Sequence, residues 1–380
     1  MSENLSPEFV IKHSPYFNYT FCLNKYNFLY EVLLQNIAEN LLNVKIIISS
    51  SSGSFENYEL FFDEIKTDTE FKITKFDFLF NLSLIKNLTE KDIDVIRITL
   101  FSNEKEICHR SFNLEIFPMD HFGGLQVLPQ LLSSYIIPNH PSIYQIKTEA
   151  IKILEDNNLS PAFEGYQTKS KERILQVISS IYKAIQNHEL IYSSMPPSFE
   201  SQGQRIRLVD QVISTKFGNC IDISLLFAAC LEAIDLNPII VITKGHAFVG
   251  VWLEDQRFDA MINYDQAAIS KRIASGIKDI ALIESTSICK GQNVSFNQAI
   301  ASAEMQLMND TNFILSIDVK NTRSNGISPL PIHKEDFNLL KDNTFSRSNS
   351  DLDEDYEIGE TYDDLELTDL SNLTKQKIWE

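Results

Sequence analysis

The stretch that decides the fold of this chain is Gly218-Asn-Cys-Ile-Asp-Ile-Ser-Leu-Leu-Phe227. It opens the segment Ile221–Ala233, which is apolar almost all round. A helix of that composition is buried on most sides, and the Asn237-Pro238 pair that follows would stop it. The sequence therefore predicts a central helix packed inside a folded domain.

Cys220 stands at the expected start of that helix. The side chain of Asn219 is suited to the N-cap, which places Cys220 at the first helical position. Unpaired backbone N–H groups and the positive end of the helix dipole stabilise a thiolate there. This placement favours a cysteine nucleophile. The alternative interpretation is a small core residue, as Cys230 on the same helix is expected to be.

Strands are predicted after the helix. Ile239–Ile242 is a short continuous apolar run typical of a buried strand, and Lys244–Leu253 predicts the next strand, with His246 near its start. After a helical insertion at about 265–275, Ile280–Thr286 predicts a third strand that carries Glu284.

The order cysteine, histidine, carboxylate along the chain is that of a catalytic triad. His246 would take the thiol proton, and a carboxylate would hold the imidazole in the right tautomer. Glu284 is the first choice for that acid, with Asp259 and Asp265 as alternatives.

These elements resemble the transglutaminase-like branch of the papain-type cysteine hydrolases over residues 200–290. The family's G-x-C element matches Gly218-Asn-Cys220, and its H-A-x-V-x-V strand matches His246-Ala-Phe-Val-Gly-Val251. Ile283-Glu-Ser-Thr286 is the nearest match to the family's V-D-P-T-like strand end, with Glu in place of Asp and a longer gap from the histidine. The resemblance implies a transglutaminase-like α+β domain and a Cys–His–acid triad.

Papain-like enzymes also place an oxyanion-stabilising side chain upstream of the cysteine, where this chain has Gln204 and Gln211. Either amide could join the backbone N–H of Cys220 as a donor to the oxyanion. The alternative is that both are ordinary surface glutamines. Arg207 nearby is expected to form an ion pair within this acidic chain.

A second resemblance covers most of the chain. Gly203-Gln-Arg-Ile-Arg207, Gly245–Trp252 and Ile327-Ser-Pro-Leu-Pro331 are similar to the N-terminal region of large bacterial superfamily-1 helicase-related proteins. In those proteins a β-rich domain and a transglutaminase-like domain precede a helicase. The resemblance implies a bacterial DNA-processing or anti-phage defence setting, and a helicase-like partner or a helicase region beyond Glu380.

The N-terminal part is predicted to be β-rich. Alternating apolar residues over Phe76–Leu84, Ile96–Leu100 and Phe112–Ile116 predict strands with one wet face, and Tyr30–Leu42 is the place for one short helix. Helical spacing then appears in Ile143–Leu154 and Ile174–Ile185.

The expected fold class is α+β. We expect a sandwich-like β domain over 1–118, a helical connector over 119–200, a transglutaminase-like domain over 201–332 and an acidic, disordered linker or tail over 333–380. Residues 351–369 carry ten Asp or Glu and no Lys or Arg.

Composition narrows the function classes. The 380 residues carry a net charge of −19, which argues against direct, salt-driven nucleic-acid binding. Five scattered cysteines without a CxxC pair indicate thiols in a reducing compartment. No signal peptide or spanning segment is evident, so a cytoplasmic protein without membrane association is expected.

The sequence thus predicts a cysteine peptidase or amidase, or an acyltransferase, acting on a protein or peptide. No metal or organic cofactor is implied, because Cys108-His109 lacks further ligands at metal-binding spacing. The alternative is a catalytically silent module that binds a helicase-like partner.

Overall fold

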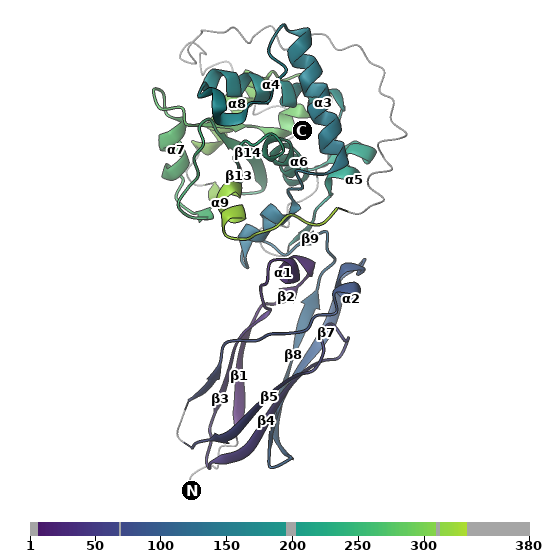
Figure 1. Ribbon diagram of the computed structural model, residues 1–380, viewed down its shortest axis with the longest axis vertical. Coiled ribbons are helices and arrows are strands. Elements are labelled where there is room, and N and C mark those ends of the chain that lie inside the picture. The colour runs from purple at the N-terminus through teal and green to yellow at the C-terminus, as the bar shows by residue number, and fades with distance from the viewer. Residues whose placement is uncertain (1–6, 68–69, 195–202, 309–311, 333–380) are drawn as a thin grey trace. The chain divides into compact units, whose positions relative to one another are not determined.

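A computed structural model describes residues 7–67, 70–194, 203–308 and 312–332 of the chain. Helices and strands are both abundant and occur with several sheets, so the fold is α+β as predicted (Figure 1). The chain divides into two compact units: residues 1–127 with 202–204, and residues 128–201 with 205–380. The predicted acidic segment 333–380 lies outside the described residues, and the predicted domain boundaries at 118 and 200 remain predictions.

Strands dominate the first unit. A five-stranded sheet has the order β2-β8-β7-β4-β5, and a three-stranded sheet has the order β1-β3-β6. The elements are β1 (Glu8–His13), β2 (Tyr16–Phe17), α1 (Tyr19–Leu23), β3 (Leu29–Gln35), β4 (Leu41–Ser50), β5 (Tyr58–Ile65), β6 (Phe71–Ile73), α2 (Leu82–Lys86), β7 (Asp92–Ser102), β8 (Lys105–Ile116) and β9 (His121–Phe122).

The alternating pattern predicted two of these strands correctly. Ile96, Ile98 and Leu100 of β7 are fully buried, and Leu114 and Ile116 of β8 are buried too. The two strands pair antiparallel along most of their length. The alternation of apolar and polar residues therefore indicates a sheet that packs one face against the core.

The strand predicted over Phe76–Leu84 is wrong. Phe76 and Phe78 are buried, but they lie in an extended segment outside any strand, and a helix, α2, starts at Leu82. The side chain of Asn81 accepts a hydrogen bond from the backbone N–H of Leu84 at 3.2 Å and caps that helix. Successive side chains of an extended backbone point to opposite sides, so every second aromatic ring can be buried. The alternating sequence pattern can therefore occur without a regular strand.

The short helix predicted in Tyr30–Leu42 is also wrong. Residues 29–35 form β3, which pairs antiparallel with β1 on one side and with β6 on the other. Hydrogen bonds to two neighbours and burial of Val32 and Leu34 override the local pattern.

A buried carboxylate organises the serine-rich turn after β4. Asp94 of β7 is fully buried and accepts five hydrogen bonds from Ser50, Ser51, Ser52 and Ser54, at 2.6–3.0 Å. Burial alone raises the pKa of Asp94, but these donors outweigh it and hold the pKa below its usual value. The charge of Asp94 therefore fixes the turn formed by Ser50–Ser54.

The second unit is built on an antiparallel sheet with the order β15-β17-β13-β14-β16. Its helices are η1 (Pro129–Tyr135), α3 (Pro141–Asp156), η2 (Gly165–Thr168), α4 (Lys171–Asn187), α5 (Val209–Thr215), α6 (Cys220–Glu232), α7 (Ala267–Ile273), η3 (Ser285–Ile288), α8 (Phe296–Leu307) and α9 (Val319–Ser324). Its strands are β10 (Ile191–Tyr192), β12 (Phe217–Gly218), β13 (Pro238–Thr243), β14 (His246–Trp252), β15 (Ile262–Asn263), β16 (Ile280–Ile283) and β17 (Phe313–Asp318), and β11 (Gln204–Arg205) straddles the boundary between the units.

Helix α6 is the centre of this unit, as its composition predicted. All its residues except Glu232 are buried, and it contacts β13 and β14 of the sheet as well as α3 and α4 (Figure 1). The predicted helices within 143–154 and 174–185 are α3 and α4, and the predicted strands at 239–242 and 244–253 are β13 and β14.

Trp252 belongs to the core of the sheet. It is buried with Phe248 and Phe258, and its indole N–H donates to Oδ2 of Asp318 at 3.0 Å. Asp318 also accepts from the backbone N–H groups of Phe258 and Asn321. This buried network pins the strand that begins with His246.

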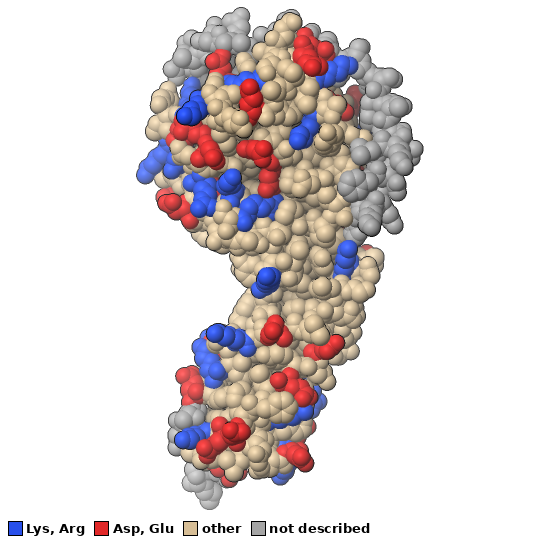
Figure 2. Space-filling model, viewed as in Figure 1, with Lys and Arg blue, Asp and Glu red and all other residues tan. Residues whose placement is uncertain are grey.

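Charged side chains of both signs are interspersed on the face of the molecule in Figure 2. Several basic side chains of the described residues form ion pairs; Lys171, for example, contacts Glu254 at 3.0 Å and Asp279 at 2.8 Å. None of the helices within the described ranges has the length and apolar character needed to cross a membrane.

Candidate active site

The start of α6 positions Cys220. The side chain of Asn219 accepts a hydrogen bond from the backbone N–H of Asp222, and the Asp222 carboxylate accepts one from the backbone N–H of Asn219, both at 3.1 Å. This reciprocal capping box fixes the first turn. Cys220 is the first residue of the helix and is 5% exposed.

A second contact fixes the helix against β14. The hydroxyl of Ser224 lies 2.7 Å from the carbonyl oxygen of Cys220 and 3.1 Å from that of Ala247. Ala247 follows His246 in the strand, so this one side chain ties the helical turn of the thiol to the strand of the imidazole.

His246 lies between the thiol and a carboxylate. Its Nε2 is 2.8 Å from Oε2 of Glu284, and a side-chain hydrogen bond with Cys220 is among the influences that raise the pKa of its ring. Because a carboxylate only accepts, Nε2 carries the proton of the first contact. The other ring nitrogen, Nδ1, is then the one that serves the thiol.

Glu284 follows the last residue of β16 and is 1% exposed. Its Oε1 accepts from the backbone N–H and the hydroxyl of Thr286, at 2.9 and 2.6 Å. Its Oε2 accepts from His246 and from Nε2 of Gln306 on α8, at 2.8 and 2.6 Å. Four donors thus surround the carboxylate, which fixes its plane and offsets the cost of its burial.

The electrostatics of the pair favour a charged imidazole. Burial by itself lowers the pKa of His246, but the charge of Glu284 and the hydrogen bond with Cys220 outweigh it and raise the pKa to about 10. For Glu284, burial raises the pKa, while the charge of His246 and the hydrogen bonds outweigh it and lower the pKa. Both shifts favour an imidazolium–carboxylate pair at neutral pH.

The alternative acids lie elsewhere. Asp259 and Asp265 are exposed, and Oδ1 of Asp265 accepts from the backbone N–H of Ala267 at 2.9 Å, at the start of α7. Of the three predicted carboxylates, Glu284 is the one hydrogen-bonded to His246. The structure thus brings together Cys220, His246 and Glu284.

The two glutamines do not share one environment. Gln211 is exposed, and its side-chain oxygen accepts from the backbone N–H of Leu208 at 3.3 Å at the start of α5. Gln204 is half-buried in β11 and belongs to the first compact unit. The oxyanion role of either residue stays a prediction.

Arg207 forms the expected ion pair. Its guanidinium donates to Oδ2 of Asp222 at 2.9 Å, and its backbone N–H donates to Oδ1 at the same distance. The guanidinium also lies over the ring of Phe217, 4.8 Å from the centroid. Burial raises the pKa of Asp222 in spite of these donors, so Arg207 compensates a charge buried beside Cys220.

Sequence reasoning missed two neighbours of the triad. Gln306 donates to Glu284 from α8, and the pKa of Tyr192 of β10 is raised by burial and by Cys220. Neither residue belongs to a recognisable motif. The signal for Tyr192 lies in strand pairing, because β10 runs parallel to β12, which immediately precedes Asn219.

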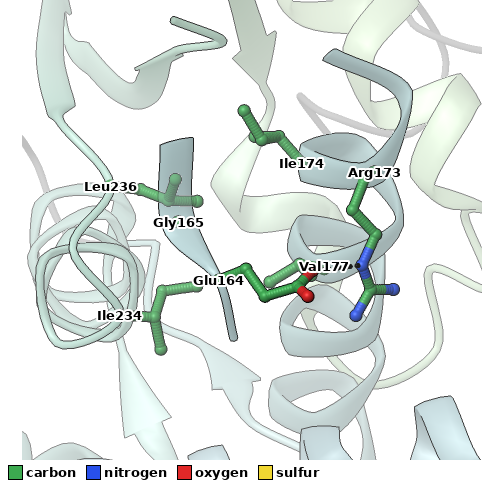
Figure 3. Close-up of a pocket in the computed structure, with 7 residues that line it drawn as sticks. All are labelled: Glu164, Gly165, Arg173, Ile174, Val177, Ile234 and Leu236. Carbon is green, nitrogen blue, oxygen red and sulfur yellow. Dashed lines mark ion pairs between the residues drawn. The ribbon is translucent and has the colours of Figure 1, made fainter. Parts of the chain in front are cut away.

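A small cavity lies away from these residues in the second unit. It holds about 10 Å³, room for about one water molecule, and Figure 3 shows Arg173 and Glu164 meeting at its side in an ion pair with 3.8 Å between Nε and Oε2. None of the triad residues lines this cavity. The residues that line it are Glu164, Gly165, Arg173, Ile174, Val177, Ile234 and Leu236.

Comparison with known proteins adds nothing to this geometry: no protein-family model and no curated protein matches the chain. Within the described residues, no group of three or more His, Cys, Asp or Glu side chains is arranged to hold a metal ion.

Proposed function

We propose that this chain is a cysteine hydrolase of transglutaminase-like type that cleaves a peptide or amide bond. One observation carries the proposal: Nε2 of His246 lies 2.8 Å from Oε2 of Glu284, and the hydrogen bond with Cys220 helps to raise the pKa of the same ring. A histidine that bridges a thiol at a helix N-terminus to a buried carboxylate has the parts that thiol activation requires.

The chemistry follows from these contacts. His246 takes the proton of Cys220, and the thiolate sulfur attacks the substrate carbonyl carbon to give a tetrahedral oxyanion. The C–N bond breaks as the imidazolium returns the proton to the leaving nitrogen, which leaves a thioester on Cys220. Water, deprotonated by His246, then attacks the thioester and releases the acid and the free thiol.

The first turn of α6 supplies one donor to the oxyanion. The backbone N–H of Cys220 belongs to the four N-terminal amides of the helix that have no intrahelical partner. Such an amide, with the helix dipole behind it, stabilises negative charge on the carbonyl oxygen. An amine that replaces water in the last step would give acyl transfer with the same residues.

The resemblances in the sequence support the finer parts of the proposal. The first unit would be a sandwich-like domain, and the second a transglutaminase-like domain after a helical connector. The proposal that the chain acts in the cytoplasm, in a bacterial DNA-processing or anti-phage assembly with a helicase-like partner, is supported by the second resemblance and by the sequence alone.

A catalytically silent module is the second candidate. The low exposure of the thiol favours it, since Cys220 is 5% exposed and the side chain of His246 is 17% exposed. A triad that no substrate can reach would persist as packing geometry, and the domain would then bind a peptide or a helicase-like partner.

Competitive labelling of the purified chain with iodoacetamide, from pH 5 to pH 9, separates the two candidates. Peptide mass spectrometry follows each cysteine, and fully buried Cys230 on the same helix serves as the internal reference. We expect Cys220 to label selectively at acidic pH and to lose that reactivity in His246→Ala.

The matched control is His188→Ala. His188 is a buried histidine whose Nε2 lies 3.1 Å from a carboxylate oxygen of Glu149, so this variant removes a similar pair without touching Cys220. If Cys220 labels no faster than Cys230 in the wild type, the enzyme proposal fails and the silent module takes its place.

A further inference from the structure

The backbone of Tyr192 is fixed beside the nucleophile. Strand β10 pairs parallel with β12, and Tyr192 is in register with Gly218, two residues before Cys220. The backbone N–H of Ile191 donates to Lys216 O at 2.7 Å, and that of Ser193 donates to Gly218 O at 2.8 Å. Two hydrogen bonds thus tie the chain on either side of Tyr192 to the segment that leads into α6.

The phenol of Tyr192 reaches the reacting atom. Burial raises the pKa of its hydroxyl, and so do a side-chain hydrogen bond with Cys220 and the nearby charges of Cys220, Glu284 and Cys289. Tyr192 is 37% exposed, whereas Cys220 is 5% exposed. Tyr192 is therefore a solvent-accessible neighbour of a thiol that is itself almost covered.

The direction of this hydrogen bond is settled by the charges around it. Burial and the proximity of Cys220 both raise the pKa of Tyr192 well above its usual value, so the phenol keeps its proton at neutral pH. A protonated phenol beside a thiolate is a donor, and the sulfur is the acceptor.

We infer that Tyr192 is a further catalytic residue, whose hydroxyl donates a hydrogen bond to the Cys220 sulfur and stabilises the thiolate before attack. The inference rests on the proposed function and deepens it. The thiolate then has two donors, the His246 imidazolium and the Tyr192 phenol. Attack on a carbonyl carbon removes the negative charge from sulfur and weakens this hydrogen bond, so the stabilisation acts on the free nucleophile.

Tyr192→Phe keeps the aromatic ring and removes only the hydroxyl oxygen. If Tyr192 served only in packing, the ring would be enough, whereas the proposed role needs the hydroxyl. In the full-length chain we expect the midpoint of Cys220 alkylation against pH to rise by about one unit, as one charge-assisted hydrogen bond is lost. The alkylation rate at pH 6 would fall about tenfold, while the rate at the basic plateau would be retained.

Tyr166→Phe is the matched control. The hydroxyl of Tyr166 donates to Trp252 O at 2.9 Å and accepts from the backbone N–H of Asn237 at 2.8 Å, away from the triad. Its removal should lower the melting temperature and leave the alkylation midpoint at the wild-type pH. A midpoint in Tyr192→Phe that equals that of Tyr166→Phe would overturn the inference.

The two levels of the proposal fail in different ways. If wild-type Cys220 shows no His246-dependent labelling at acidic pH, the proposed function fails. If the wild type shows it and Tyr192→Phe keeps the same midpoint, the role of Tyr192 alone fails.

A second variant covers the case in which Tyr192→Phe does not fold. Replacing Tyr192 with 3-fluorotyrosine keeps the hydroxyl and makes it a stronger donor. The midpoint should then move toward acidic pH, and a midpoint that stays at the wild-type value or moves toward basic pH contradicts the inference.

Discussion

At the residue scale, the site depends on one imidazole with two different partners. Cys220, His246 and Glu284 were predicted from the order of a cysteine helix, a histidine strand and an acidic strand end, and the structure places them in contact. The sequence did not predict that Tyr192 and Gln306 lie at the site. Each approaches the site through long-range pairing or packing, and neither spacing nor composition encodes such contacts.

Glu284→Gln tests the carboxylate. Thr286 donates twice to one oxygen of Glu284, so the amide oxygen takes that side and the NH₂ group faces Nε2 of His246. The NH₂ group of the glutamine and a protonated Nε2 would then be two donors facing each other. The imidazole therefore carries its proton on Nδ1 instead, and Nδ1 can no longer accept the proton of Cys220. Loss of the carboxylate also lowers the pKa of His246 from about 10.

We expect Cys220 alkylation at pH 6 to fall by at least about tenfold in Glu284→Gln. Glu149→Gln, in the other buried histidine–carboxylate pair, is the matched control and should alkylate at the wild-type rate. Equal rates in both variants would show that Glu284 does not orient His246.

At the element scale, the sequence patterns predicted helices and strands correctly where the burial of an element is the same along its whole length. Helix α6 is buried all round, and β7 has one buried face, so composition alone identified both. The strand predicted around Phe76 and Phe78 was wrong because this segment has only an isolated bridge, between Phe80 and Phe55. The helix predicted over 30–42 was wrong because residues 29–35 pair with a strand on each side, which overrides local preference.

Asn219→Ala tests the first turn of α6. Removing the side chain that accepts from the Asp222 N–H should lower the free energy of unfolding by about 1 kcal/mol. Because the cap also sets the geometry of the turn that bears Cys220, we expect alkylation at pH 6 to slow by about threefold. Chemical denaturation and alkylation rates measure the two effects.

Ser295→Ala is the control for this variant. Ser295 caps α8 with the same reciprocal arrangement, in which its hydroxyl accepts from the Gln298 N–H at 3.3 Å. It should lose a similar amount of stability and keep the wild-type alkylation rate. An Asn219→Ala variant that loses stability yet alkylates normally would mean that the cap does not position the nucleophile.

At the scale of the whole molecule, the chain is two compact units with separate buried cores. The sequence predicted two or more domains from length and from the change of pattern after Pro118. The compact units divide after Val127, and the predicted boundary at 118 stays a prediction.

Asp94→Asn tests the first unit by itself. The amide keeps the shape of the carboxylate but loses the charge that accepts five hydrogen bonds, which should cost about 2–3 kcal/mol at pH 7. The folded pKa of Asp94 is depressed, so its contribution is present above the unfolded value of about 3.9 and is lost as the pH falls through the folded pKa.

Thermal unfolding should therefore separate Asp94→Asn from the wild type at pH 7, and the difference should shrink as the pH falls below about 4 toward the folded pKa of Asp94. Exposed Asp92→Asn, whose carboxylate bonds the next backbone N–H at 2.8 Å, should stay close to the wild type throughout. Cys220 alkylation should be unchanged in both variants, because that thiol lies in the other unit.

The burial of α6 on every side has a consequence for how this thiol can be controlled. A helix whose twelve residues Cys220–Leu231 are all enclosed cannot slide or rotate without opening the core around it. We expect its reactivity to change through the side chains around the sulfur, among them the imidazole at the start of β14 and the phenol on β10, while the position of the nucleophile stays fixed.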